Sequence, residues 1–221
     1  MTGDEPTWLQ HHRIRLALHR LDPGRADLRP LLLLHGLGEA TPAAVPAHIH
    51  WPGPVLGLDF TGHGRSTVPT GGGYTAEILV ADVDTALEHT GPVTVVGRGL
   101  GAYIGLLAAA ARPDTVRGVV LVDGPGLAGG GTEPGSPSIV APFPGAQAPP
   151  DPYALVELAR DPRPSSYAQT FVRFLLEESD LDEPIVVDTL VRPPWVQAVS
   201  AEPGVVERPL RDALARYAEL D

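Results

Sequence analysis

Short apolar runs recur along the first 128 residues and are separated by segments with helical spacing. Residues 12–21 alternate apolar and polar positions, which is typical of a half-exposed strand. Helices are predicted over 74–89, which carries one apolar stripe, and over 101–112, which is almost wholly apolar. Four runs are apolar enough to predict strands buried on both faces: 31–34, 54–58, 93–96 and 116–122. This alternation predicts an α/β fold with a mostly parallel sheet flanked by helices.

The pattern changes after the strand that ends near residue 123. Glycine and proline crowd residues 124–152, which predicts a mobile loop because few apolar side chains are available to anchor it. Beyond it, helices are expected to begin near Ser165, Pro194 and Pro209. We therefore expect three segments, which are an α/β core over 1–128, a Gly/Pro-rich loop over 129–152 and a helical, cap-like C-terminal region over 153–221.

The sheet is expected to be shortened at its C-terminal end. Only residues 184–187 resemble a strand after the loop, so the predicted sheet ends at 116–122. An open apolar edge invites pairing with another chain, and natural proteins cover or pair such edges. We accordingly expect either coverage by the C-terminal helices or a homodimer or hetero-partner through this edge, with the partnered form favoured.

Composition excludes several classes of function. The chain has 27 acidic and 16 basic residues and a formal net charge of −11, which disfavours nucleic-acid binding. All the basic residues are arginines, so lysine-dependent Schiff-base and P-loop chemistry is excluded. There is no cysteine, which excludes thiol nucleophiles and disulfides. The polar, acidic start and the lack of a long apolar segment predict a cytoplasmic protein without membrane contact.

Three motifs follow predicted strands in order. They are His-Gly-Leu-Gly at 35–38, Asp-Phe-Thr-Gly-His-Gly-Arg-Ser at 59–66 and Gly-Arg-Gly-Leu-Gly at 97–101. Over residues 12–123 this succession resembles the alpha/beta-hydrolase superfamily, with its oxyanion loop, its GHG-x-S segment and its nucleophile elbow. The resemblance implies a G-x-S-x-G elbow between a strand and a helix.

The elbow departs from the family pattern, because Gly99 stands where the nucleophile belongs. The resembled enzymes order their triad as nucleophile, acid and histidine, whereas all eight histidines here lie at or before His89. A serine nucleophile needs a nearby imidazole to take its proton. The sequence therefore predicts a catalytically degenerate homologue with no catalytic residue of the family type.

A binding site remains possible at the same place. The resemblance implies that the backbone N–H groups of Leu37 and Leu100 are the oxyanion donors, and these survive the loss of a side chain. The following helix presents its positive end, and Arg98 adds a full charge. We expect Leu37, Arg98, Gly99 and Leu100 to bind an acidic group, and the protein to bind a small apolar or acidic ligand or a protein partner.

Two alternatives stay open. One is an active hydrolase of an ester or similar small substrate, using a non-standard residue set drawn from Asp59, His63 and Ser66. The other is a dinucleotide-binding protein, because Gly97, Gly99 and Ala102 fit G-x-G-x-x-A and Asp123 ends the next strand. Under the leading hypothesis no cofactor and no metal ion is expected, and the two histidines of the oxyanion and GHG motifs are expected to be structural.

Overall fold

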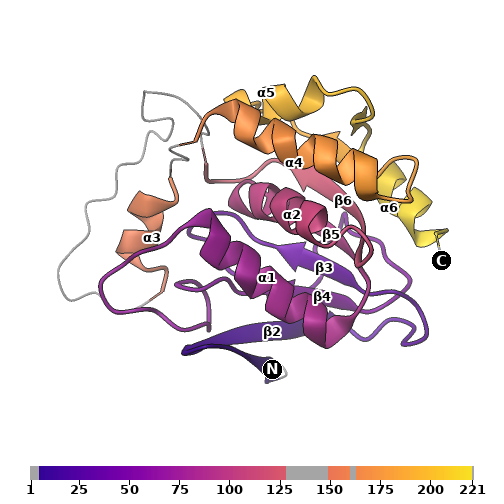
Figure 1. Ribbon diagram of the computed structural model, residues 1–221. Coiled ribbons are helices and arrows are strands. Elements are labelled where there is room, and N and C mark those ends of the chain that lie inside the picture. The colour runs from indigo at the N-terminus through magenta and orange to yellow at the C-terminus, as the bar shows by residue number, and fades with distance from the viewer. Residues whose placement is uncertain (1–4, 128–148, 160–162, 221) are drawn as a thin grey trace.

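An eight-stranded sheet forms the centre of the molecule (Figure 1). The computed structural model describes residues 5–127, 149–159 and 163–220. The strand order is β1-β2-β4-β3-β5-β6-β7-β8. β2 pairs antiparallel with β1 and β4, and all other neighbours are parallel. The strands are β1 (Thr7–His11), β2 (Ile14–Asp22), β3 (Leu31–Leu34), β4 (Val55–Leu58), β5 (Val93–Arg98), β6 (Val116–Val122), β7 (Ile185–Asp188) and β8 (Val206–Glu207).

Helices cover the two faces of the sheet unequally (Figure 1). The first face packs against α1, α2, α4 and α5, whose buried side chains join one large apolar cluster. The other face packs against α6 and a smaller cluster. The helices are α1 (Ala76–Thr90), α2 (Leu100–Ala111), α3 (Pro152–Glu157), α4 (Ser165–Glu178), α5 (Pro194–Ser200) and α6 (Leu210–Ala218).

Side-chain alternation along the strands explains why both faces are apolar. In β3, Leu32 and Leu34 join the larger cluster, while Leu31 and Leu33 join the smaller one. All four leucines are buried, as expected for a strand with neighbours on both sides and layers on both faces. The predicted strands and helices of the first 123 residues are confirmed, with ends that differ by a few residues.

The expectation that the sheet ends at β6 is wrong. β7 pairs in parallel with β6, and β8 pairs with β7, so the sheet edges among the described residues are β1 and β8. The strand-like run at 184–187 corresponds to β7, but the sequence does not show that it pairs with β6, and β8 has only two residues, too few to show periodicity. The edge that motivated the expected dimer therefore does not exist at β6, and the C-terminal region adds strands as well as helices.

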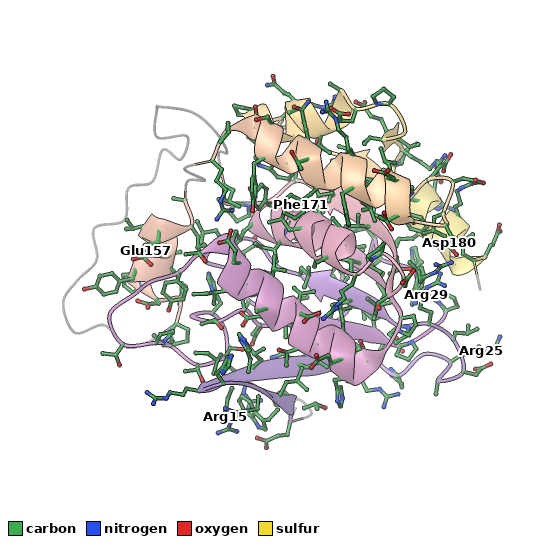
Figure 2. The ribbon with its side chains drawn as sticks, in the orientation of Figure 1. Arg15, Arg25, Arg29, Glu157, Phe171 and Asp180 are labelled. Carbon is green, nitrogen blue, oxygen red and sulfur yellow. The ribbon has the colours of Figure 1, made fainter. Side chains whose placement is uncertain are left out.

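Two further elements are absent from the sequence-based prediction. β1 forms a hairpin with β2, and α3 begins after Asp151, whose carboxylate accepts the backbone N–H of Tyr153. Glu157 on α3 accepts the N–H groups of Gly73 and Tyr74, which ties this short helix to the loop before α1 (Figure 2). Most of the predicted mobile loop, 128–148, lies outside the described residues.

No helix in the described part of the chain has both the length and the apolar character needed to cross a bilayer.

Packing of α6 on β6 depends on one glycine. Gly118 has a φ of 103°, and a Cβ placed there would overlap with the ring of Tyr217 on α6. The Tyr217 hydroxyl in turn donates to the carbonyl of Glu183, just before β7. Helix α6 is thus held against the sheet by the close contact between the Tyr217 ring and the Gly118 backbone.

We predict that Gly118→Ala lowers the free energy of unfolding by about 2 kcal/mol or more, because it adds both backbone strain and overlap with Tyr217. Urea unfolding measures this loss. Gly71→Ala is the matched control, since Gly71 also has a positive φ (91°) but a Cβ there meets nothing within 4 Å. Equal losses for the two variants would contradict the role of the Tyr217 contact.

Candidate functional site

A sharp turn joins β5 to α2 at Gly99. Its φ of 49° and ψ of −109° place it in a region that favours glycine, and it forms the N-cap of α2. Its N–H donates to the carbonyl of Val122 (3.1 Å). A Cβ at this position would overlap with the backbone of Gly124 and the carbonyl oxygen of Pro125. The turn therefore has the strand-to-helix shape of a nucleophile elbow, but the space above it holds backbone.

The two N–H groups expected to bind an anion share one acceptor within the chain. Leu37 donates to the carbonyl oxygen of Pro125 at 2.8 Å, and Leu100 donates to the same oxygen at 3.0 Å. A carbonyl oxygen has two lone pairs, so it satisfies both donors at once. Both N–H groups that the sequence analysis named as donors are thus bonded to one peptide carbonyl of the same chain.

The segment that supplies this carbonyl is fastened on both sides. Before it, the carboxylate of Asp123 accepts the N–H groups of Leu190 (2.8 Å) and Val191 (3.0 Å) in the loop after β7. After it, the carbonyl of Leu127 accepts the indole N–H of Trp195 on α5 at 2.9 Å. Trp195 is buried and stacks edge-on against Tyr103 of α2. These bonds hold residues 123–127 against the elbow.

Arg98 does not point a free charge at the elbow. Its guanidinium makes a bidentate ion pair with Glu39, with Nε and Nη2 at 3.1 and 2.9 Å from the two carboxylate oxygens. Glu39 also accepts the N–H of Gly36 at 3.0 Å. This contact raises the pKa of Arg98 and, against the opposing effect of burial, lowers the pKa of Glu39. The pair ties the loop after β3 to the end of β5.

His35 is held as a neutral ring. Its Nδ1 lies 2.8 Å from the carbonyl of Gly36, and its Nε2 accepts the N–H of Phe60 at 3.1 Å, so the proton belongs on Nδ1. Burial, reinforced by the neighbouring His63, lowers the pKa of His35 to about 4. A ring with both nitrogens engaged and a depressed pKa serves to join two loops.

The remaining polar residues of the GHG segment are buried and bonded to backbone. Burial alone would raise the pKa of Asp59, but hydrogen bonds from His19, Arg65 and Thr41 hold it at about 2. The Ser66 hydroxyl donates to the carbonyl of Asp59 (2.6 Å) and accepts the N–H of Ala17 (2.9 Å).

His63 is fully buried, and its pKa is lowered chiefly by burial. Its Nδ1 lies 3.1 Å from the carbonyl of Thr61, and its Nε2 has no hydrogen-bond partner among the described residues. All three residues are buried, and only Ser66 borders a pocket, so the structure does not bring Asp59, His63 and Ser66 together at an open surface.

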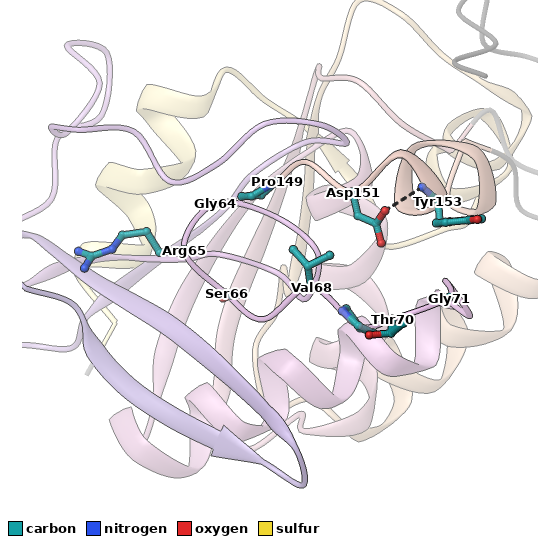
Figure 3. Close-up of a pocket in the computed structure, with 10 residues that line it drawn as sticks. Gly64, Arg65, Ser66, Val68, Thr70, Gly71, Pro149, Asp151 and Tyr153 are labelled. Carbon is teal, nitrogen blue, oxygen red and sulfur yellow. Dashed lines mark hydrogen bonds between the residues drawn. The ribbon is translucent and has the colours of Figure 1, made fainter. Parts of the chain in front are cut away.

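A polar pocket of about 640 Å³ opens beside this segment (Figure 3). Ser66 lines it together with Arg65 and Asp151, but no histidine is among its lining residues. The Asp151 carboxylate is already engaged, since it accepts the Tyr74 hydroxyl at 2.6 Å and the N–H of Tyr153 at 3.1 Å. Among the described lining residues, the pocket thus offers Ser66 no histidine and only a carboxylate that is already hydrogen-bonded.

The other residues singled out in the sequence are structural where the structure describes them. Gly97 allows α2 to approach β5, because a Cβ there would overlap with the backbone of Gly101. Asp123 bonds the loop after β7, as described above. Within residues 5–127, 149–159 and 163–220, no three histidine, aspartate or glutamate side chains gather as a metal site would require.

The chain belongs to a known family. The family described as "alpha/beta hydrolase fold" matches residues 29–184, which is most of the chain and includes all three motifs. This confirms the resemblance found in the sequence and the fold class inferred from it. The match covers the elbow itself, so the glycine at position 99 stands inside a recognised member of the family.

Individual relatives agree with this placement. Lipase LipV of Mycobacterium tuberculosis is 39% identical over 72 residues, which span 32% of this chain and 27% of the lipase. The chain thus matches only about a quarter of the length of this curated relative. This similarity supports the family without carrying the lipase's activity to the present chain.

Solved structures share the fold across nearly the whole chain. The thioesterase domain from the curacin biosynthetic pathway superposes with a TM-score of 0.65 and 18% identity, covering 98% of both chains. The haloalkane dehalogenase DatA from Agrobacterium tumefaciens superposes with a TM-score of 0.62 and 18% identity, covering 93% of this chain and 88% of the dehalogenase. At these identities the likeness concerns the fold alone.

Sequence reasoning missed Pro125 and Trp195 as parts of this site. The run Asp-Gly-Pro-Gly at 123–126 carried a usable signal, since a Cβ at Gly126 would overlap with the side chains of Leu37 and Leu100. Paired glycines after a strand indicate that backbone approaches another element closely. What the sequence did not contain is which element is approached.

We predict that His35 lowers the free energy of unfolding as the pH is lowered through a defined window. The folded-state pKa of about 4 lies below the ordinary value of 6.5. Between pH 6.5 and 4 the unfolded chain binds a proton at His35 that the folded chain does not, so the free energy of unfolding falls by up to about 3 kcal/mol as the pH is lowered.

Urea unfolding of wild type and His35→Gln at pH 7.5, 6.5, 5.5 and 4.5 measures this effect. Glutamine can keep both hydrogen bonds without titrating, so the advantage of wild type over the variant should shrink toward low pH. Asp82, whose pKa burial raises to about 7, contributes the opposite slope to both proteins and cancels in the difference. A constant difference between wild type and His35→Gln over this pH range would refute the prediction.

Proposed function

We propose that this protein is a catalytically degenerate alpha/beta hydrolase that acts by binding a small ligand or a protein partner. The observation that carries the proposal is the carbonyl oxygen of Pro125, bonded to both the Leu37 and Leu100 N–H groups directly above Gly99. The nucleophile is absent, and a peptide group fills the place where a substrate carbonyl would be polarised. Both losses act on the same step.

The energetic consequences favour binding over catalysis. Removal of a catalytic serine or its histidine typically costs on the order of 10⁶ in rate, and what remains comes from binding and the oxyanion hole. Here the two donors of that hole are already satisfied by Pro125. The remaining contribution of the hole is available only if residues 124–126 move away from the elbow.

An acidic ligand at Leu37, Arg98, Gly99 and Leu100 is compatible with this arrangement only by exchange. A carboxylate would replace the Pro125 carbonyl on the two N–H groups, and charge-assisted bonds are stronger than neutral ones. The Arg98 guanidinium would have to bind the ligand carboxylate while it remains paired with Glu39. The bonds from Leu190, Val191 and Trp195 oppose the movement of the segment. Partner binding remains a proposal, and the sheet edges β1 and β8 replace β6 as the surfaces for it.

An active hydrolase that uses Asp59, His63 and Ser66 is the second candidate. Its support is limited to the presence of Ser66 in the lining of the polar pocket. Against it, the hydroxyl is bonded to two backbone groups, and His63 is fully buried with a depressed pKa.

A dinucleotide at Gly97, Gly99 and Ala102 is disfavoured for a separate reason. The N-terminal N–H of α2 that would receive the pyrophosphate is the Leu100 N–H, which Pro125 occupies. Calorimetric titration with NAD distinguishes this alternative, and we expect no saturable binding at micromolar concentrations.

We predict that neither wild type nor Gly99→Ser hydrolyses p-nitrophenyl acetate or butyrate above the rate in buffer. The serine hydroxyl would have no imidazole to take its proton and would overlap with Pro125. Absorbance at neutral pH measures turnover. Activity in wild type that disappears in His63→Ala would overturn the non-catalytic assignment and favour the second candidate.

We also predict that Gly99→Ala destabilises the fold by about 2 kcal/mol or more, because its side chain would overlap with backbone at Gly124 and Pro125. Urea unfolding measures the loss. Gly91→Ala is the matched control, since Gly91 also has a positive φ (71°) but a Cβ there meets nothing within 4 Å. If Gly99→Ala costs no more than Gly91→Ala, the segment at 124–125 does not press on the elbow.

A further inference from the structure

A second pocket, of about 380 Å³, lies at the carboxyl ends of β3, β5 and β6, on the face covered by α6. Its floor includes Leu33, Val96 and Val122, which belong to or pack on the smaller apolar cluster, and Leu210 of α6 closes one side. Gly99, Leu37 and Leu100 are not among its lining residues. Arg98 of the elbow motif does line the pocket, so the pocket adjoins the elbow without including Gly99 or the two N–H donors.

Topology explains why a crevice forms here. After β3 the chain continues to β4, which lies on the β1 side of the sheet. After β5, the other neighbour of β3, the chain continues to β6 on the β8 side, so the direction of progression reverses between β3 and β5. Open α/β sheets bind ligands outside the carboxyl ends of strands at such a reversal. The reversal lies between Leu33 on β3 and Val96 on β5, and both line the pocket.

The connection from β3 to β4 leaves this crevice partly uncovered. Residues 35–54 form neither helix nor strand, and prolines at 42, 46, 52 and 54 interrupt them. A helix in this connection would pack its side chains onto the sheet, but here only a few residues of the segment reach the smaller cluster, among them Ile49. Pro42, Pro46 and Ile49 instead form a wall of the pocket.

The lining chemistry defines the ligand class. The walls are mostly aliphatic, and the imidazoles of His35 and His48 also line the pocket. The two charged side chains, Glu39 and Arg98, neutralise each other in a bidentate ion pair. Thr41 is also in the lining; its side chain packs over Gly57 of β4, and its Oγ1 is buried without a hydrogen-bond partner among the described residues. A buried unpaired hydroxyl is costly, and a ligand with one hydrogen-bonding group would satisfy it once rotation about χ1 turns the hydroxyl toward the pocket.

We infer that this pocket binds a small, uncharged and largely apolar molecule that carries one hydroxyl or carbonyl group directed at Thr41. An apolar cavity of about 150 Å³ holds a benzene ring, so this volume suits a molecule of about two fused rings or an aliphatic chain of similar bulk. The inference rests on the proposed function in one respect, because it names the ligand class of a protein proposed to act by binding.

Binding is tested with the full-length protein and N-phenyl-1-naphthylamine, an uncharged probe that fluoresces in apolar surroundings. We expect saturable binding that is displaced by 1-naphthol. Ala40→Trp places an indole at the exposed rim of the pocket and should weaken probe binding at least tenfold. Ala47→Trp is its matched control, since Ala47 is an exposed alanine of the same connection outside the lining, and it should bind as wild type does.

A second pair of variants examines the interior. Val122→Phe fills the floor and should abolish binding, with a urea unfolding curve to establish that it folds. Thr41→Val removes the unpaired hydroxyl at nearly constant shape. It should weaken displacement by 1-naphthol about threefold to tenfold and leave displacement by naphthalene unchanged.

Leu190 and Val191 carry the most exposed large apolar side chains among the described residues, so the double variant Leu190→Ser/Val191→Ser is included. Wild-type binding by this variant supports the pocket. Loss of binding in it, or unchanged binding in Ala40→Trp, would overturn the inference. Ester turnover is measured separately. Turnover together with intact probe binding would contradict the proposed function alone. Absence of both turnover and probe binding would contradict this inference alone.

Discussion

One carbonyl oxygen organises the part of this molecule where the family carries out its chemistry. Pro125 accepts the N–H groups of Leu37 and Leu100, which come from the loop after β3 and the start of α2. Without an acceptor, these two donors would be buried and unsatisfied, at a cost of roughly 1–3 kcal/mol each. The segment after β6 supplies the acceptor, and so β3, β5 and β6 are fastened together at their carboxyl ends.

The rest of the site follows from that contact. A side chain at position 99 and the Gly124–Pro125 backbone require the same space, so the glycine at the elbow and the filled hole depend on each other. The Arg98–Glu39 pair, the Asp123 bonds and the Trp195–Leu127 bond each secure one of the segments involved. The architecture of an alpha/beta hydrolase is thus retained, while the polar groups that would act on a substrate satisfy one another. A fold supports many functions, and here the site rather than the fold argues for binding.

Different helices cover the two faces of the sheet. Helices α1, α2, α4 and α5 seal one face into a continuous core. The other face is covered by α6 and by a proline-rich connection without regular structure, and this is where the apolar pocket lies. The position of the pocket is a consequence of strand order and of local chain stiffness.

The sequence by itself determined the strands and helices up to residue 123, the family, and the absence of a nucleophile at position 99, because apolar periodicity and motif spacing are local properties. It showed a strand-like run at β7 but not its pairing with β6, because strand pairing is a tertiary property, and β8 is too short, at two residues, to have a pattern of its own. It named Leu37 and Leu100 as donors but not Pro125 as their acceptor. That pairing joins residues 88 and 25 positions apart, and only the packing of three strands side by side brings them within a hydrogen bond.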